Sequence, residues 1–597
     1  MEPADPPTFR AQYARRLVRE KLFEELSRRH AAYGTEPGCA PPPGPPLLGG
    51  GPQTQPPHHP SEFCIVGAGM AGLYAAMVLD EAGVSYDLLE SAGRVGGRVF
   101  TKRLGDGKNE YYDVGAMRFP KIKVMQKTFE LFAELEIPLV DYYLAGENCP
   151  VMYNDIVGPP ENPHETDPYR ISQENGGVIP DEAVKDGAEM ILSEAFGPLK
   201  EALREDFEQG FQMLMELDSF STREFLRSRL YGDSGLDFHT VQWLETVSTS
   251  SGLFDQSFSE TVIDSLDFDE SPDEAWKCVE GGTSVVTEAM LAKIKTKPEL
   301  NTRVTGIALG RGAKESDTKM LVTLTNASGA EETREYDTVF NTTTLACAQR
   351  IDLTGAELHP AQKDALRALH YDASAKVAIK FKTPWWITQC GITEGGVAST
   401  DLPLRTCVYP SFSIHDPVDA PSVLLASYTW AQDAQRISAL ITPDSPSGEE
   451  ALKDLLLRDL ARLHARHDIT LDFLRDQYVT HHAYSWYADP NTAGAFALFG
   501  PGQFSNFYPF LARPAADGKL HFVGEASSAH HAWIVGALDS AQRAVMYALL
   551  RFGLREEAEE IETRWGPVGE VELAKDGTAH LQVAMGCLRT EEIMRCA

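Results

Sequence analysis

The sequence has no closely spaced pair of cysteines. Nine cysteines are scattered over 597 residues, and no two of them form a Cys-x-x-Cys motif. An odd, dispersed set argues against both a disulfide framework and a zinc cluster, and it suits a reducing compartment. We therefore expect no metal site.

Long hydrophobic runs and an excess of positive charge are also missing. No stretch resembles a secretory signal or is long enough to span a bilayer, so the sequence predicts a cytoplasmic protein with no membrane association. With 54 Lys and Arg against 87 Asp and Glu, the net charge is −33. Such a surface should repel nucleic acid and anionic membranes, so neither is an expected partner.

A glycine-rich turn is the most informative motif present. The apolar residues 63–66 are followed by Gly67-x-Gly69-x-x-Gly72 and then by a helix-compatible run. This order predicts a dinucleotide-binding unit, because the glycines let the backbone approach a pyrophosphate at the N-terminus of the helix. A second apolar run ends in Glu90, whose carboxylate could accept ribose hydroxyl protons and would repel a 2′-phosphate.

The residues that follow favour a flavin over a nicotinamide cofactor. Gly96 and Gly97 permit a second close backbone approach, and Arg98 can offer its guanidinium to phosphate oxygens. Together with residues 113–116, the segment 90–98 resembles the start of the flavin amine oxidase superfamily, whose members carry FAD. The resemblance covers residues 61–552 and implies an FAD-dependent oxidoreductase.

A closing FAD motif of the same family is matched near the C-terminus. Glu525 follows a short apolar strand and precedes residues 532–537; it would bind the ribityl and phosphate region, and its alternative role is that of a helix cap. Residues 491–496 lack the cysteine that tethers FAD in some monoamine oxidases, so non-covalent FAD is expected. Val304 would contact the adenine side by its backbone. The implied cofactor-binding residues are Gly67, Gly69, Met70, Ala71, Gly72, Glu90, Ser91, Gly97, Arg98, Gly115, Ala116, Met117, Arg118, Val304, Glu525, Trp533, Ile534, Val535, Gly536 and Ala537.

Arg118 decides between amine and amino acid substrates. An arginine beside a flavin site is costly unless it meets an anion. Residues 115–120 resemble the Gly-x-Met-Arg-x-Pro of fungal and venom L-amino acid oxidases, whose arginine binds the substrate α-carboxylate. An internal salt bridge is the alternative. Residues 400–410 give a second match, which implies that Tyr409 donates its hydroxyl to the same carboxylate, although an isolated tyrosine is more often part of a core.

Three further residues complete the expected site. Ala532 and Trp533 would border the substrate, with Trp533 as an apolar wall beside the α-carbon. Lys376 lies in an apolar strand, where the family places a lysine that holds a water near flavin N5; a surface lysine with a buried stem is the alternative.

The resemblance implies oxidation of L-amino acids to 2-oxo acids, ammonia and H₂O₂, by hydride transfer from Cα to flavin N5 and with O₂ as the second substrate. Two alternatives stay open: an amide-forming L-amino acid 2-monooxygenase, and a non-catalytic FAD-binding scaffold that recruits a partner through its N-terminus. We also expect a homo-oligomer.

The chain is too long for one hydrophobic core, so several domains are expected. We predict an α/β fold whose Rossmann-like FAD-binding domain is discontinuous, with a mainly helical insertion and a mixed-sheet substrate-binding domain. The FAD-binding parts are 61–120, 273–360 and 481–555, the helical insertion is 121–272, and the substrate-binding domain is 361–480.

The two ends of the chain have a different character. Residues 1–60 are predicted to form a helix at 9–33 followed by a proline-rich linker at 37–60. Candidates for the apolar stripe of this helix are Leu17, Leu22, Phe23 and Leu26. The linker composition suggests that the helix is an arm outside the catalytic fold. The tail 556–597 receives no assigned role.

Overall fold

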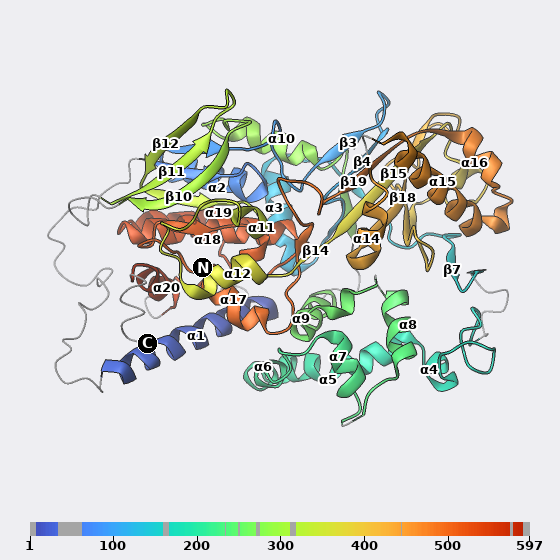
Figure 1. The fold of residues 1–597 in the computed structure, drawn as a ribbon, viewed down its shortest axis with the longest axis horizontal. Coiled ribbons are helices and arrows are strands. Elements are labelled where there is room, and N and C mark those ends of the chain that lie inside the picture. The colour runs from blue at the N-terminus through green and yellow to red at the C-terminus, as the bar shows by residue number, and fades with distance from the viewer. Residues whose placement is uncertain are drawn as a thin grey trace.

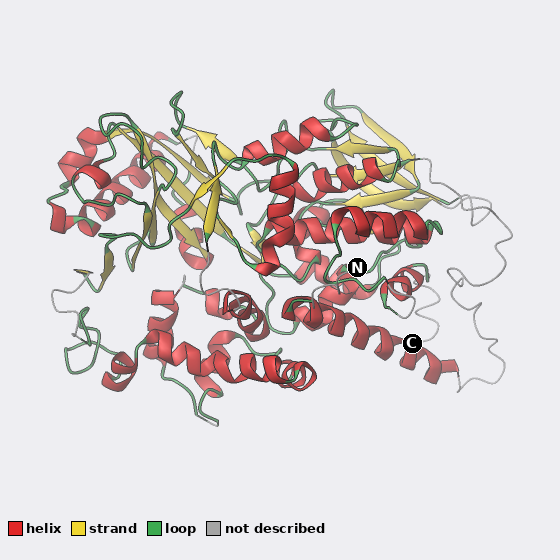
Figure 2. Ribbon diagram, turned by 180° about the vertical axis from the view of Figure 1, so that it is seen from behind, coloured by secondary structure: helices red, strands yellow, loops and turns green. Residues whose placement is uncertain are grey.

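A computed structural model of the protein shows two groups of strands, with helices packed beside and below them (Figures 1 and 2). The structure describes residues 7–33, 62–158, 166–232, 234–248, 251–269, 275–310, 318–442, 445–573 and 577–588. The proline-rich linker predicted at residues 37–60 lies outside the described residues.

A parallel sheet with the order β2-β1-β13-β21 joins three distant parts of the chain. Its strands are β1 (Phe63–Val66), β2 (Tyr86–Leu89), β13 (Thr338–Asn341) and β21 (Leu520–Phe522). All four residues of β1 are apolar and buried, as expected for a strand covered on both faces. The carboxyl ends of these strands share one edge, which is where open α/β sheets bind ligands.

Helices cover the parallel sheet, and an antiparallel sheet lies beside it. α2 (Met70–Glu81) packs against both α10 (Ser284–Lys293) and α18 (Ile534–Arg551). α18 is buried along nearly its whole length, so it forms the centre of this half of the molecule. The antiparallel sheet consists of β10 (Arg303–Gly310), β11 (Lys319–Thr325) and β12 (Glu331–Tyr336).

A seven-stranded sheet occupies the other half of the molecule, with the order β19-β15-β18-β17-β16-β7-β8. It is mixed because β16 and β7 run parallel, whereas the other neighbours are antiparallel. The strands are β7 (Val151–Tyr153), β8 (Ile156–Gly158), β15 (Ser374–Phe381), β16 (Gly396–Thr400), β17 (Thr406–Tyr409), β18 (Ser422–Trp430) and β19 (Tyr478–Ser485). One face packs on buried leucines of α15 (Pro446–Leu463).

The described residues between 181 and 269 form six α-helices, which lie below the sheets in Figure 1. They are α4 (Asp181–Asp186), α5 (Ala188–Glu205), α6 (Phe207–Met215), α7 (Thr222–Ser228), α8 (Phe238–Ser248) and α9 (Phe258–Asp269). In α5 the buried residues Ile191, Ala195, Leu199 and Leu203 recur at every fourth position, the spacing of an amphipathic helix.

Shorter elements connect these layers. The remaining strands are β3 (Thr101–Arg103), β4 (Tyr111–Asp113), β5 (Phe119–Pro120), β6 (Leu139–Asp141), β9 (Trp276–Val279), β14 (Tyr371–Asp372) and β20 (Phe496–Ala497). The remaining α-helices are α3 (Gln126–Glu134), α11 (Leu345–Ala348), α12 (Pro360–Ala368), α13 (Trp385–Thr388), α14 (Ala431–Ser438), α16 (Leu471–Gln477), α17 (Gln503–Leu511), α19 (Arg555–Trp565) and α20 (Ala579–Gly586). Short 3₁₀ helices lie at Lys123–Met125, Leu253–Asp255, Ala465–His467 and Glu525–Ser527.

The N-terminal helix α1 (Phe9–Tyr33) is part of the fold, so its prediction as an external arm is wrong. It packs on α17 and α9, and Tyr13, Leu17 and Leu22 are at most 2 % exposed. Two residues expected in its apolar stripe, Phe23 and Leu26, instead face solvent. The composition of the linker was the only basis for the arm, and it carries no information about where the helix before it packs.

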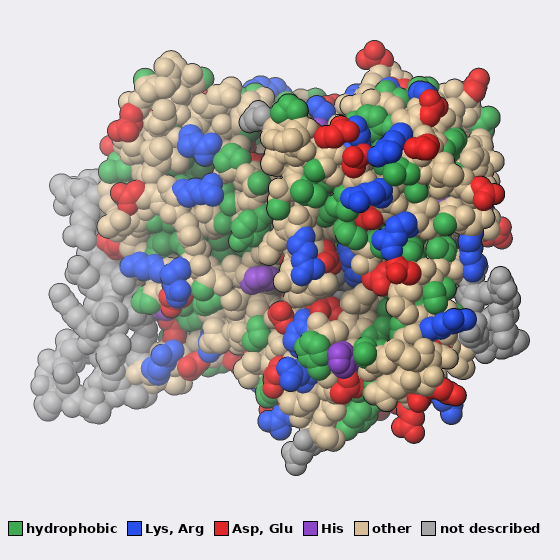
Figure 3. Space-filling view, turned by 45° about the vertical axis from the view of Figure 1, so that its right-hand side comes forward, with side chains coloured by type: hydrophobic (Ala, Val, Ile, Leu, Met, Phe, Trp, Pro, Cys, Tyr) green, Lys and Arg blue, Asp and Glu red, His purple; other side chains and the backbone are tan. Residues whose placement is uncertain are grey.

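The surface mixes both signs of charge. On the face drawn in Figure 3, basic side chains are interspersed with acidic ones. None of the helices in the described part of the chain has the length and apolar character needed to cross a lipid bilayer.

Candidate active site

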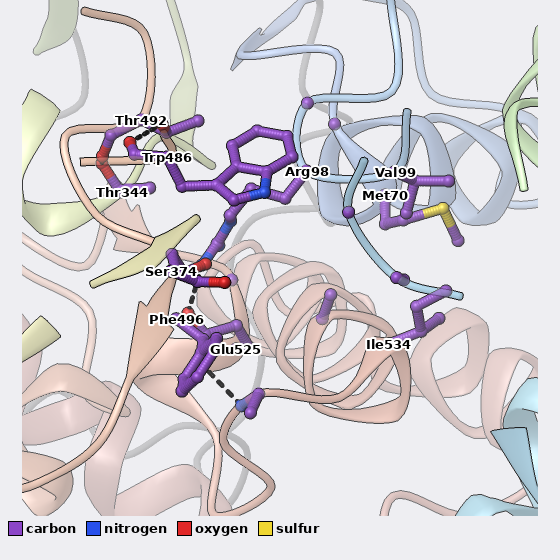
Figure 4. Close-up of a pocket in the computed structure, with 18 of the residues that line it drawn as sticks. Met70, Arg98, Val99, Thr344, Ser374, Trp486, Thr492, Phe496, Glu525 and Ile534 are labelled. Atoms are coloured by element: carbon purple, nitrogen blue, oxygen red, sulfur yellow. Dashed lines mark hydrogen bonds and ion pairs between the residues drawn. The ribbon is translucent and has the colours of Figure 1, made fainter. Parts of the chain in front are cut away.

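A cavity of about 560 Å³ lies at the carboxyl edge of the parallel sheet and reaches the seven-stranded sheet (Figure 4). Gly67, Glu90, Thr342 and Gly524 line it, and each lies just beyond the end of a different parallel strand. Lys376 enters from β15 on the opposite side. A volume of this size is typical of small-molecule and cofactor sites.

The glycine turn has the geometry that its sequence predicts. Gly67 has a φ of +106°, and a Cβ on Gly72 would lie 1.9 Å from the Gly67 carbonyl oxygen. Gly69 meets Gly97 so closely that a Cβ on Gly97 would lie 3.3 Å from the Gly69 Cα. No side chain caps the N-terminus of α2, so its first N–H groups can bind an anion.

Glu90 is fixed at the cavity edge by two backbone hydrogen bonds. Its carboxylate accepts from the N–H of Ala68 at 2.8 Å and from that of Ala92 at 2.7 Å, and only 8 % of the residue is exposed.

Val304, expected on the adenine side, is buried in β10 and is not among the residues that line the cavity. Its backbone contact with the cofactor stays a prediction.

Arg98 and Glu525 bind each other inside the cavity (Figure 4). Arg98 Nη1 lies 2.6 Å from Glu525 Oε1 and also donates to the carbonyl of Ala495. Glu525 accepts further hydrogen bonds from the N–H groups of Ala497 and Ala532, so it joins three separate segments of the chain. α18 has no side-chain cap at its N-terminus, which argues against the helix-cap alternative for Glu525.

Lys376 is 1 % exposed, so it is not a surface lysine. Its Nζ donates to the carbonyls of Asp113 at 2.9 Å and Gly115 at 2.7 Å, and lies 3.3 Å from the Met117 sulfur. Burial is the main reason that the pKa of Lys376 is lowered to about 7; Asp113 opposes this shift, and Arg118 adds to it. Its charge is therefore poised to change near neutral pH.

Arg118 lines the cavity among aromatic rings. Its guanidinium carbon lies 5.6 Å from the centre of the Trp276 ring and 6.0 Å from that of Tyr142. Within the described residues no carboxylate forms an ion pair with Arg118, so the internal salt bridge weighed as the alternative is not observed there. The arginine is available for an anionic ligand.

Tyr409 does not reach the cavity, and its predicted role in binding the substrate is wrong. It is fully buried in the core on the far side of the seven-stranded sheet, where its hydroxyl lies 2.6 Å from His464 Nε2. The physical reason is strand alternation: neighbouring Val408 belongs to the core on the other face, so Tyr409 points away from it.

Sequence reasoning missed Tyr428, the tyrosine that does line this part of the cavity. It lies directly opposite Lys376 across β15 and β18, and Lys376 Nζ is 4.5 Å from the centre of its ring. The alternation of Tyr428 and Trp430 along β18 was the available signal, because residues two apart share a face.

A wall contributed by α9 was also missed. Glu260, Asp264 and the loop residue His531 line the cavity, and His531 Nδ1 lies 2.8 Å from a Glu260 oxygen. Leu253 and Gln256 also line the cavity.

The structure brings most of the predicted site residues together. Those lining the cavity are Gly67, Gly69, Met70, Ala71, Glu90, Ser91, Gly97, Arg98, Gly115, Ala116, Met117, Arg118, Lys376, Glu525, Ala532, Trp533, Ile534 and Ala537. Gly72, Val304, Tyr409, Val535 and Gly536 are not among them. A Cβ on Gly72 or Gly536 would collide with a backbone oxygen, which gives these glycines a packing role.

The donor set fits a flavin dinucleotide. The N-termini of α2 and α18 have no side-chain caps, and Gly69 and Gly97 leave room for a pyrophosphate close to the backbone. Glu90 is placed to accept hydrogen bonds from ribose hydroxyls. Among the described residues that line the cavity none is a cysteine, which agrees with non-covalent binding.

Comparison with known proteins identifies the relatives of this chain. The family model of flavin-containing amine oxidoreductases matches residues 70–549. An L-amino-acid oxidase 4 of Hebeloma cylindrosporum is 38 % identical, over 81 % of this chain and 80 % of its own length. An L-amino-acid oxidase of Siganus canaliculatus is 30 % identical, over 80 % of this chain and 84 % of its own.

Two further matches qualify this relationship. A putative bifunctional amine oxidase of Dictyostelium discoideum is 37 % identical over 86 % of this chain, but the chain spans only 48 % of that protein. A solved cyclohexylamine oxidase from Brevibacterium oxydans matches with a TM-score of 0.57 and 17 % identity, covering 85 % of this chain and 99 % of its own, which shows a shared fold.

Proposed function

The chain belongs to the flavin-containing amine oxidoreductases, and from this premise we propose that it oxidises L-amino acids to 2-oxo acids with release of ammonia and H₂O₂. FAD is the cofactor of the family. The single observation that carries the choice of an amino acid over a plain amine is Arg118, a cavity arginine without a carboxylate partner among the described residues.

The roles of the surrounding residues follow from their positions. Arg118 would bind the α-carboxylate through paired charge-assisted hydrogen bonds, and Tyr428, which lines the same cavity, would assist it. Trp533 and Trp276, whose ring centres are 6.4 Å apart, would form the apolar wall that orients the substrate. Bound FAD would supply the hydride acceptor.

Lys376 would act at the same end of the cavity. Two backbone carbonyls fix the position of its Nζ. When Lys376 is protonated, its positive charge at this position would stabilise negative charge that develops when O₂ is reduced. As part of the same proposal, Lys376 would hold a water near flavin N5.

We infer a finer division of the fold on the same grounds. The parallel sheet with α2 and α18 would form a discontinuous Rossmann-like FAD-binding domain, and the seven-stranded sheet with the helices of 181–269 would surround the substrate. The supporting observation is that the cavity lies where these groups of elements meet.

The test is an assay of the purified, FAD-loaded protein against the common L-amino acids, with ammonia, 2-oxo acid and H₂O₂ measured together. Equal amounts of all three support the proposal. An amide product without H₂O₂ would identify a monooxygenase instead. Turnover of plain amines but of no L-amino acid would overturn the assignment of Arg118.

A further inference from the structure

The wall formed by α9 is charged, which is unusual for the side-chain pocket of an enzyme that would accept apolar amino acids. Three carboxylates, Glu260, Asp264 and Asp267, lie along one stripe of the helix. Two basic groups face them: Arg10 from α1 lies 2.5 Å from Asp267 and 3.1 Å from Asp264, and His531 lies 2.8 Å from Glu260. Even with a charged histidine, one negative charge is unbalanced.

Asp264 is a carboxylate of this stripe that lines the cavity. Half of its side-chain surface is accessible. Its Oδ1 bonds to Arg10, while its Oδ2 accepts no hydrogen bond from the described residues. Desolvation raises the pKa of Asp264 to about 6, and Arg10 opposes this shift. Because Asp264 lines the cavity, part of its accessible surface faces the cavity.

A second hydrogen-bond acceptor without a partner lies near Asp264 at the cavity. Gln256 lines the cavity, and its buried Oε1 has no hydrogen-bond partner among the described residues. A buried acceptor of this kind is costly unless a donor reaches it. A carboxylate oxygen and an amide oxygen, both without partners, suit a ligand group that has several N–H donors and a positive charge.

Asp264 and Arg118 line the same cavity, and aromatic side chains lie between them. Phe268, one helical turn or about 6 Å further along α9, stacks on Trp276, which lies against Arg118. Phe268 also packs against Trp533, which lines the cavity, so aromatic side chains connect the two charged residues that face it. A substrate with its carboxylate on Arg118 would extend its side chain toward Asp264.

We propose that Asp264 recognises the substrate side chain and that the enzyme prefers L-amino acids with a terminal cation, namely lysine, ornithine and arginine. This inference rests on the proposed oxidation of L-amino acids. Arg10 and Asp267 act as positioning groups, because Arg10 binds Oδ1 of Asp264 and is itself held by Asp267.

The first test compares L-lysine with L-norleucine, which has the same carbon chain without the charge. At pH 8 the wild-type kcat/KM for lysine should exceed that for norleucine at least tenfold, and Asp264→Asn should lower this ratio at least tenfold. Asp264→Glu should retain part of the preference. The matched control is Asp269→Asn on the same helix, whose carboxylate pairs with Lys200 and Arg204; it should leave the ratio unchanged.

A second test needs no turnover. 6-Aminohexanoate has a carboxylate and an ammonium but no α-amino group, so calorimetry with the FAD-loaded protein should show it binding at least tenfold more tightly than hexanoate. Asp264→Asn should abolish the difference. A wild-type ratio near one in both experiments would overturn the role of Asp264, whereas failure of every L-amino acid to react, with 6-aminohexanoate still preferred, would overturn only the proposed function.

Discussion

At the scale of single residues, the proposed function depends most on Arg118. Arg118→Ala should cost about 3 kcal/mol of transition-state stabilisation, more than a hundredfold in kcat/KM, because the substrate carboxylate would lose its counter-charge. Arg118→Lys should recover only part, since an ammonium cannot reproduce the two-point contact. Steady-state assays with L-amino acids would measure this; values within threefold of wild type would contradict the assignment.

Lys376 gives a prediction about pH. With a pKa near 7, its ammonium is present below that pH and is lost above it. The rate constant for reaction of the reduced enzyme with O₂ should therefore fall as pH rises through about 7, and Lys376→Met should be slow throughout and lack this step. Stopped-flow mixing with oxygen measures the rate, and a wild-type step retained in the variant would exclude Lys376 as its source.

Arg118 and Lys376 could be predicted from the sequence as cavity residues, because each is the one charged residue within a short apolar segment. It could not distinguish Tyr409 from Tyr428, since both are tyrosines in strands of one sheet. Which face each tyrosine occupies depends on the register of β15, β17 and β18, and a bulge lies between Thr406 and Val408 in the pairing of β17 with β18. Register is a property of the assembled sheet and cannot be read from one strand.

At the scale of elements, α1 should contribute to stability as a core helix. Leu17→Ala removes a side chain that is 2 % exposed and should cost about 3 kcal/mol, because the cavity it leaves is only partly filled by relaxation. Phe23→Ala, 58 % exposed on the same helix, is the control and should cost less than about 0.5 kcal/mol. Thermal unfolding of the two variants measures the difference, and equal midpoints would mean that α1 does not pack in solution as described.

Among the elements, some could be predicted from the sequence and others could not. The β1–α2 unit was predictable because strand, glycines and helix are contiguous and each glycine has a steric reason within that unit. The packing of α1 was not, because its partners α9 and α17 lie more than two hundred residues away in sequence. The charged wall of the cavity depends on that packing, since Arg10 belongs to α1.

At the scale of the whole molecule, the segment after α19 connects parts of the chain that lie close to the site. Glu570 is 4 % exposed and accepts hydrogen bonds from Ser528, Ala529 and Arg543, so it ties the loop before Trp533 to α18. Burial opposes ionisation of Glu570, but His530 and Arg543 outweigh it and lower its pKa to about 2. Because the pKa is lower in the folded state, the stability it adds is present above about pH 4.5 and is lost as pH falls toward 2.

Glu570→Gln should therefore destabilise the protein by about 3 kcal/mol at neutral pH and by progressively less below pH 4.5. Unfolding midpoints of wild type and variant at pH 7 and pH 3.5 would test this, with Glu572→Gln as a control, since that carboxylate lies near the surface and pairs with Arg15 and Arg19. A difference that does not change with pH would assign the effect to packing instead of charge.

The order of strands in the parallel sheet also determines when the protein can fold during its synthesis. β13 pairs with β21, which lies about 180 residues later in the chain; at roughly 5–20 residues per second the ribosome needs about 10 to 40 s to make that stretch. Throughout this interval the edge of β13 has unpaired backbone groups open to other chains. Slower initiation, lower temperature or added chaperone should therefore raise the yield of folded protein more than any change to the finished surface.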